Sequence, residues 1–93
     1  MPRPPLPRRV CCQLNALGFR PIGAAAAKAD ALRIGVDELE AIRLADIEGL
    51  YQDAAAERMG VSRQTYARIL NRARMAVARS LVEQKMLFVG DAA

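Results

Sequence analysis

The sequence contains no histidine, the side chain that enzymes use most often as a general base and a frequent metal ligand. It also lacks a glycine-rich loop of the kind that cradles nucleotide phosphates. The acidic side chains in its middle lie on a solvated helix face and form no recognisable catalytic pair. We therefore expect a protein that is not an enzyme and that holds no cofactor.

Tryptophan is absent and large apolar residues are scarce, because much of the 53% hydrophobic composition is alanine. Alanine buries little surface, so a chain of 93 residues has material for one small core. The composition predicts a single domain that completes its core with a partner subunit. We expect a homodimer.

Long apolar runs are also missing, and none approaches the roughly 20 residues that a membrane-spanning helix needs. The N-terminus is rich in proline and arginine and lacks the apolar centre of a signal peptide. These features predict a cytoplasmic protein with no membrane partner.

The chain has two cysteines, Cys11 and Cys12, and they are adjacent. This spacing suits neither a mutual disulfide nor a C-x-x-C metal site. The simpler interpretation is two ordinary thiols, at least one of them buried in a short strand. The alternative is a redox or metal sensor attached to the rest of the domain.

Charge is unevenly distributed along the chain, whose formal net charge is +4. Seven acids and one base, Arg43, lie between Asp37 and Glu57, whereas six arginines and no acid lie between Arg58 and Arg79. Arginines gathered on one element are typical of nucleic-acid binding. A solvated helix face is the other interpretation of such a run.

The two ends of the chain differ in pattern from its middle. Residues 1–9 carry four prolines and predict an extended basic arm. Residues 84–93 form a tail with a predicted strand at Lys85–Val89. We expect this strand to pair with a strand near Val10–Leu14, in the same chain or in a partner chain.

Residues 10–34 predict little regular structure beyond the strand at Val10–Leu14. Leu17–Gly23 carries two glycines and a proline and predicts a loop. Ala24–Leu32 is rich in alanine, which favours a helix but supplies almost no side-chain volume.

Residues 35–83 predict three helices. The first covers Asp37–Glu48, where Asp37 and Glu40 resemble a capping box. Gly49 follows it, at a position where a left-handed cap favours glycine.

The next two helices are predicted at Gln52–Met59 and at about Arg63–Glu83. Gly60 ends the former, and the Ser62 hydroxyl caps the latter. Two helices joined by so short a turn indicate a helix-turn-helix. The fold class is therefore mainly α, a three-helix helix-turn-helix domain flanked by short terminal strands.

The third helix has an apolar and a polar face when its residues are projected at about 100° each. The apolar stripe consists of Tyr66, Leu70, Ala73, Val77 and Leu81. The seam with the preceding helix consists of Ala55, Ala56, Met59, Val61, Tyr66 and Ile69. The polar face carries Gln64, Thr65, Arg68, Asn71, Arg72 and Arg79. We expect these polar side chains to lack partners within the chain, because such groups read base edges and phosphates.

Gly35–Val82 resembles region 4 of sigma-70-type factors, in which an ELEAIRL-type helix precedes AAERMGVSR and an arginine-rich recognition helix. Nearly the whole chain is similar to the small bacterial and archaeal family known as domain of unknown function 134. The matching elements are Pro2-Arg3-Pro4, Arg8-Arg9-Val10-Cys11, Phe19-Arg20-Pro21, DELEAIRLAD and ERMGVSRQT. The resemblance implies a recognition helix that binds DNA through Ser62, Arg63, Gln64, Thr65, Arg68 and Arg72.

We thus expect a DNA-binding protein that reads the major groove of double-stranded DNA with the helix after Ser62 and regulates transcription. Arg3, Arg8 and Arg9 of the arm are further candidates, because they suit a phosphate backbone or a minor groove. A terminus without a binding role is the equal alternative for the arm. For the whole domain, the alternative is an interaction module that docks on transcription machinery without touching DNA.

Overall fold

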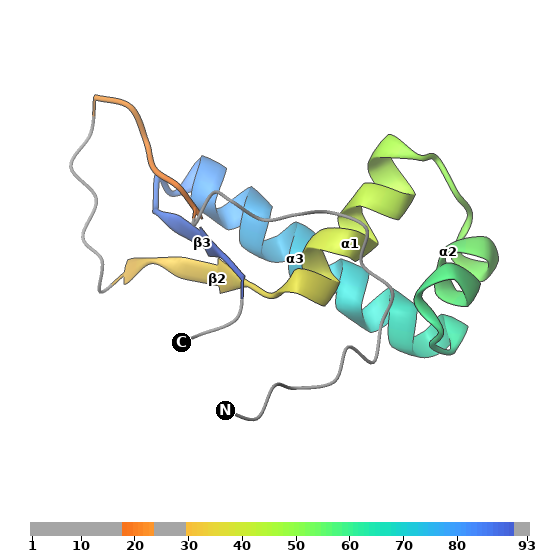
Figure 1. Cartoon of the computed structure of the whole chain (residues 1–93). Helices are drawn as coiled ribbons and strands as arrows, with labels where there is room; N and C mark the ends of the chain where they lie inside the picture. Colours follow the sequence, from red (N-terminus) through yellow and green to blue (C-terminus); the bar gives the residue numbers. More distant parts are fainter. Residues whose placement is uncertain (1–17, 24–29, 91–93) are drawn as a thin grey trace, which may run out of the picture.

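The computed structural model describes residues 18–23 and 30–90, and this part is mainly α-helical with a small sheet (Figure 1). The elements are β1 (Gly18–Phe19), β2 (Leu32–Ile34), α1 (Val36–Ile42), the π-helical segment η2 (Arg43–Ile47), α2 (Gln52–Met59), α3 (Arg63–Val82) and β3 (Leu87–Val89). Helix α3 connects the two ends of the molecule: α2 lies near its N-terminus, and the sheet lies near its C-terminus.

Helix α1 begins one residue earlier than predicted, and a different glutamate caps it. Oε1 of Glu38 accepts a hydrogen bond of 2.7 Å from the backbone N–H of Gly35. Glu40, the predicted capping partner of Asp37, is buried instead. Its two oxygens each accept a hydrogen bond of 2.9 Å from the guanidinium of Arg43.

The predicted first helix continues beyond α1 as η2, a wider turn. Its i→i+5 bonding is seen where the N–H of Glu48 donates to the carbonyl oxygen of Arg43 at 2.9 Å. Gly49 then adopts a φ of 73°. This left-handed conformation confirms the prediction of a glycine at the end of this helix.

Helices α2 and α3 form the predicted helix-turn-helix, and the bounds predicted for α2 are confirmed. Gly60 ends α2 with a φ of 73°. Ser62 caps α3, because its Oγ accepts a hydrogen bond of 3.1 Å from the N–H of Thr65. Helix α3 ends at Val82, and Glu83 is its C-terminal cap.

The larger core, here called the helical cluster, lies between α1, η2, α2 and the first half of α3. Its buried members are Ala41, Leu44, Ala55, Ala56, Met59, Tyr66, Ile69 and Leu70. All six residues predicted for the seam belong to it, Val61 as a half-buried neighbour. The hydroxyl of Tyr66 donates a hydrogen bond of 2.8 Å to the carbonyl oxygen of Ala41, so this polar group is satisfied.

The sheet has the order β1-β3-β2, with β3 antiparallel to β1 and parallel to β2. The predicted C-terminal strand is confirmed, but its described partners are β1 and β2. The partner predicted from sequence, Val10–Leu14, lies outside the described residues. Because β3 has a neighbour on each side, neither of its edges is open for pairing with another chain in this part of the structure.

Strand β1 lies where a loop was predicted, and β2 includes Leu32, the predicted end of the weak helix. Both corrections have the same cause, since strands of two or three residues are too short to show an alternating pattern. Gly18 has a packing role in β1. A Cβ atom there would clash with the backbone carbonyl oxygen of Leu87 on β3.

A second core, here called the sheet cluster, joins the sheet to α1 and α3. Its buried members are Ile34, Leu87 and Val89, with Leu32, Leu39, Ala76 and Val77 packed against them. Leu81 was predicted to belong to the packed stripe of α3, but it is 75% exposed. In this last turn of α3 the buried position is the neighbouring residue, Ser80, whose hydroxyl donates a hydrogen bond of 2.9 Å to the carbonyl oxygen of Val77.

Residues 1–17, 24–29 and 91–93 are not described, so the arm residues Arg3, Arg8 and Arg9 and the thiols Cys11 and Cys12 lie outside the described residues. Within residues 18–23 and 30–90, no helix is both long and apolar enough to cross a membrane.

Candidate nucleic-acid interface

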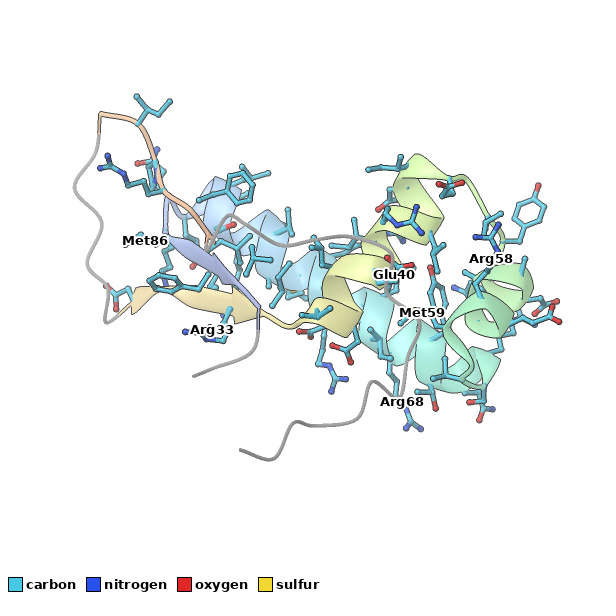
Figure 2. All side chains as sticks on the ribbon, in the orientation of Figure 1. Arg33, Glu40, Arg58, Met59, Arg68 and Met86 are labelled. Carbon is cyan, nitrogen blue, oxygen red and sulfur yellow. The ribbon has the colours of Figure 1, made fainter. Side chains whose placement is uncertain are left out.

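The first half of α3 presents a row of exposed polar side chains, here called the α3 row. It consists of Gln64, Arg68 and Asn71, which follow one another at i, i+4 and i+7 and share one helix face. Arg68 projects away from the neighbouring helices (Figure 2). It forms no ion pair or hydrogen bond with the rest of the described chain. Asn71 was predicted on the polar face of this helix but was not among the residues that the family resemblance assigns to DNA binding; its i+7 spacing from Gln64 adds it to the row.

Two other predicted arginines do have partners within the chain, contrary to the expectation from sequence. Nε of Arg63 lies 3.4 Å from a carboxylate oxygen of Asp53, and both side chains are more than two-thirds exposed. Nε of Arg72 lies 3.6 Å from Oε2 of Glu38. An ion pair this long between two solvated groups, as between Arg63 and Asp53, contributes about 0–1 kcal/mol. Glu38 is 18% exposed, and its other carboxylate oxygen caps α1.

Arg74 is held more firmly, on the η2 side of α3. Its guanidinium donates to both carboxylate oxygens of Asp46, at 2.6 and 3.3 Å. The hydrogen bond to Asp46 raises the pKa of Arg74 above its usual value. This arginine fastens α3 to η2 and does not extend the α3 row.

These contacts explain part of the charge segregation in the sequence. The acidic segment contributes a partner from α1, from η2 and from α2, and each faces an arginine of α3. Arg79 lies 3.8 Å from Glu83 at the other end of the same helix. Some arginines of this run therefore join α3 to the neighbouring helices. For that reason the number of arginines in the run overstates the positive charge available for DNA.

Ser62 and Thr65 are engaged with each other. The Ser62 hydroxyl donates a hydrogen bond of 3.0 Å to the Thr65 hydroxyl and accepts one of 3.1 Å from the Thr65 N–H. Both residues therefore fix where α3 begins, and the longer side chains beyond them are the groups that extend into solvent.

Metal binding has no support in the described residues: no group of three or more His, Cys, Asp or Glu side chains there is placed to hold an ion. The sheet contributes one further cation, Arg33, whose guanidinium lies 5.3 Å from the ring centre of Phe88. It also donates a hydrogen bond of 3.3 Å to the carbonyl oxygen of Gly90. Arg33 belongs to β2, outside the α3 row.

Sequence comparison places the chain among known relatives. The family described as Protein of unknown function DUF134 matches residues 1–92. The chain belongs to this family. The chain is similar to a UPF0251 protein of Syntrophobacter fumaroxidans, 48% identical over 97% of this chain and 58% of the relative. Another, from Vibrio vulnificus, is 49% identical over 94% of this chain and 87% of the relative.

A third relative, a UPF0251 protein from Thermoanaerobacter pseudethanolicus, is 48% identical over 96% of this chain and 75% of the relative. The names of these relatives state no activity or ligand. The chain thus spans little more than half of the Syntrophobacter protein and most of the other two. No solved structure significantly matches the chain.

Proposed function

We propose that this protein binds double-stranded DNA as a sequence-specific transcriptional regulator and has no catalytic activity. The observation that carries the proposal is the α3 row: an amide, a guanidinium and a second amide, all exposed, at the start of the second helix of a helix-turn-helix. In this motif the N-terminal residues of the second helix contact base edges in the major groove.

The roles within the row follow from hydrogen-bonding geometry. Arg68 suits a guanine, to which its planar guanidinium donates twice, and Gln64 and Asn71 suit adenines. Arg63 and Arg72 flank the row and suit phosphates, since both guanidinium groups are exposed and their ion pairs within the chain are 3.4 and 3.6 Å long. Ser62 and Thr65 orient the helix start.

The remaining parts of the proposal rest on general properties of such domains. One helix-turn-helix of this size buries limited surface on DNA, so a homodimer on two half-sites supplies the specificity. Arg3, Arg8 and Arg9 of the arm would add phosphate or minor-groove contacts. A protein that binds DNA in this way acts in the cytoplasm of a bacterial or archaeal cell.

Two observations favour the alternative, a module that docks on transcription machinery. Four arginines of α3 already face carboxylates, which lowers the positive charge offered to DNA. In addition, Ile47 and Tyr51, on either side of the η2–α2 turn, are 78% and 88% exposed. Exposed apolar side chains of this size suit a protein partner.

Fluorescence anisotropy across a salt series separates the two functions. The purified protein is titrated against a duplex from its own upstream region and against a random-sequence pool. We expect tighter binding to the upstream duplex and a salt slope of roughly 0.9 per phosphate contact. Absence of binding to either duplex at low salt would reject the proposal in favour of docking.

Substitutions in α3 test the assigned roles. Arg68→Ala should weaken binding to the upstream duplex about 5- to 150-fold, equivalent to about 1–3 kcal/mol, and relax its specificity. Arg72→Ala should weaken both duplexes alike and lower the salt slope by about 1. Arg33→Ala removes the same charge from β2 and is the matched control. Equal losses in all three variants would contradict the assignment of the α3 row.

A further inference from the structure

The carboxylate of Glu38 lies between the start of α1 and the exposed face of α3. Its Oε1 accepts a hydrogen bond of 2.7 Å from the backbone N–H of Gly35, and its Oε2 lies 3.6 Å from Nε of Arg72. The side chain of Glu38 is only 18% exposed, whereas that of Arg72 is 69% exposed. Glu38 is therefore an anion held in place beside an arginine whose guanidinium extends into solvent.

Arg72 is a neighbour of the α3 row on the surface of the helix. It follows Arg68 at i+4, so the two side chains lie next to each other along α3. Arg68 projects from this surface away from the neighbouring helices (Figure 2). A phosphate bound by Arg72 would thus lie beside the bases that the row contacts. Through Arg72, a residue of α1 can act on the proposed DNA interface.

The ion pair with Glu38 uses the inner nitrogen of the Arg72 guanidinium. Arg72 meets Glu38 through Nε and makes no hydrogen bond within residues 18–23 and 30–90. Its two terminal amino groups are therefore available as a pair of donors for two oxygens of one phosphate. Arg74 differs, because its Nε and one terminal nitrogen both donate to Asp46. That edge of the Arg74 guanidinium is occupied in joining two helices.

The pair of Arg63 with Asp53 provides a comparison within the same molecule. Nε of Arg63 lies 3.4 Å from Oδ1 of Asp53, whose side chain is 81% exposed. When such a pair forms, both side chains lose rotamer freedom, which offsets most of the attraction. Glu38 has already lost its freedom to the cap of α1, so only the arginine is ordered when Arg72 pairs with it. A capped carboxylate is thus the better support for an arginine.

We propose that Glu38 is a positioning residue for phosphate binding by Arg72. It holds the Nε side of the guanidinium and leaves the terminal amino groups for the DNA backbone. A long side chain that is ordered before binding loses less freedom when it binds, so the phosphate contact is stronger. This inference rests on the proposed DNA binding, but the ordering of Arg72 can be measured without DNA.

The first experiment measures the motion of arginine side chains in the free protein. Glu38→Gln removes the charge but keeps a carbonyl oxygen for the Gly35 N–H, since glutamine also serves in capping boxes. In NMR relaxation of the arginine Nε–H groups, Arg72 of wild type should be more ordered than Arg68. In Glu38→Gln, Arg72 should become as mobile as Arg68, while the thermal midpoint stays close to that of wild type.

Asp53→Asn is the matched control for this experiment. It removes the same charge from the other arginine–carboxylate pair at the edge of the row. The order of the Arg72 Nε–H group should be the same in this variant as in wild type. An equal loss of order in Asp53→Asn and Glu38→Gln would overturn the inference, because the effect would then follow from net charge and not from the contact.

The second experiment is a double-mutant cycle on the upstream duplex, read by fluorescence anisotropy. Arg72→Ala should weaken binding about threefold more in wild type than in Glu38→Gln, because the arginine is positioned only in wild type. Likewise, Arg72→Ala should lower the salt slope by about 1 in wild type and by less in Glu38→Gln. A purely structural role of Glu38 would leave the loss caused by Arg72→Ala the same in both backgrounds.

Three results would overturn the inference. In the free protein, Arg72 is as mobile as Arg68; in the cycle, Arg72→Ala causes equal losses in both backgrounds; or it causes the larger loss in Glu38→Gln. The last result would show that Glu38 competes with phosphate for the arginine. An ordered Arg72 that Glu38→Gln releases, in a protein that binds neither duplex, would retain the positioning by Glu38 and reject DNA binding.

Discussion

The helical cluster and the sheet cluster are built from contacts of different range. The helical cluster draws its eight buried residues from one continuous stretch, Ala41–Leu70. The sheet cluster joins Ile34 to Leu87 and Val89, more than 50 residues later. The first is fixed by periodicity and turn residues within a short sequence window. The second depends on strands that find each other only after the intervening chain has folded.

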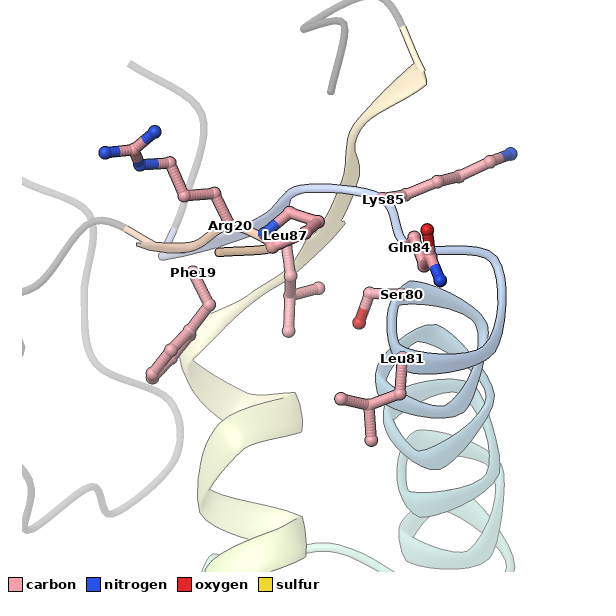
Figure 3. A pocket seen from close by; sticks show the side chains of 8 residues that line it. Phe19, Arg20, Ser80, Leu81, Gln84, Lys85 and Leu87 are labelled. Carbon is pink, nitrogen blue, oxygen red and sulfur yellow. The ribbon is translucent and has the colours of Figure 1, made fainter. Parts of the chain in front are cut away.

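The largest expected effect is a loss of unfolding free energy when one buried leucine in each cluster is replaced by alanine. Leu44→Ala empties a fully buried position in the helical cluster and should cost about 3–5 kcal/mol of unfolding free energy. Leu87→Ala in the sheet cluster should cost about 2–3 kcal/mol, because its side chain borders a surface hollow beside Phe19 and Leu81 (Figure 3) and the cavity left behind is smaller. Urea unfolding of both variants measures the difference. A greater loss for Leu87→Ala would reverse this ranking of the two clusters.

A smaller effect is expected from the hydroxyl of Tyr66. Tyr66→Phe removes its hydrogen bond to Ala41 and should cost about 1 kcal/mol. Tyr51→Phe is the matched control, since Tyr51 is 88% exposed and should change stability little.

The Tyr66→Phe variant also tests how the stability of the protein depends on pH. Burial raises the pKa of Tyr66 above the ordinary tyrosine value of about 10, so folding favours the protonated phenol. This contribution to stability is complete below pH 10 and is lost as the pH rises through the pKa of the folded state. Unfolding free energy measured from pH 8 to 11 should fall less steeply in Tyr66→Phe than in wild type. Equal slopes would mean that the pKa of Tyr66 is the same in the folded and the unfolded state.

The smallest expected effect is a gain at the turn that links α3 to the sheet. Gln84 has a φ of 57°, and a left-handed conformation costs a residue with a side chain roughly 1–2 kcal/mol. Gln84→Gly should therefore stabilise the protein by about 0.5–1 kcal/mol, after the greater freedom of glycine in the unfolded chain is counted. Thermal unfolding gives the readout. Gln64→Gly, at a helical position, should lower stability, and a loss in both variants would show that Gln84 is not strained.

The helical cluster was largely predictable from sequence because each of its features is local. Gly49, Gly60 and Ser62 end or begin helices by their own chemistry, and all three predictions are confirmed. The π-helical turn was not predictable, since it inserts an extra residue without disturbing the apolar spacing before it. Glu40 was assigned the wrong role because its spacing suits both a cap and an i,i+3 pair with Arg43, and spacing alone does not choose between them.

The candidate interface was predictable in its position but not in its internal contacts. Helical projection correctly placed Gln64, Arg68 and Asn71 on an exposed face. It could not show that Arg74 is fastened to Asp46, 28 residues earlier in the chain. Ion pairs between helices depend on how the helices cross, and a single-helix projection contains no information about a neighbour.

The central position of β3 has a consequence for the order of folding. Its partners precede it by 55 residues in β2 and by 70 in β1, as the pairs Leu32–Leu87 and Gly18–Phe88 show. Closing loops of this length is entropically costly until the chain between them is compact, whereas the contacts of α2 with α3 close quickly. The three helices should therefore assemble first and act as the template on which β3 docks. We expect contacts that form last in this way to be the first to open in the native protein, so that local unfolding begins in the sheet.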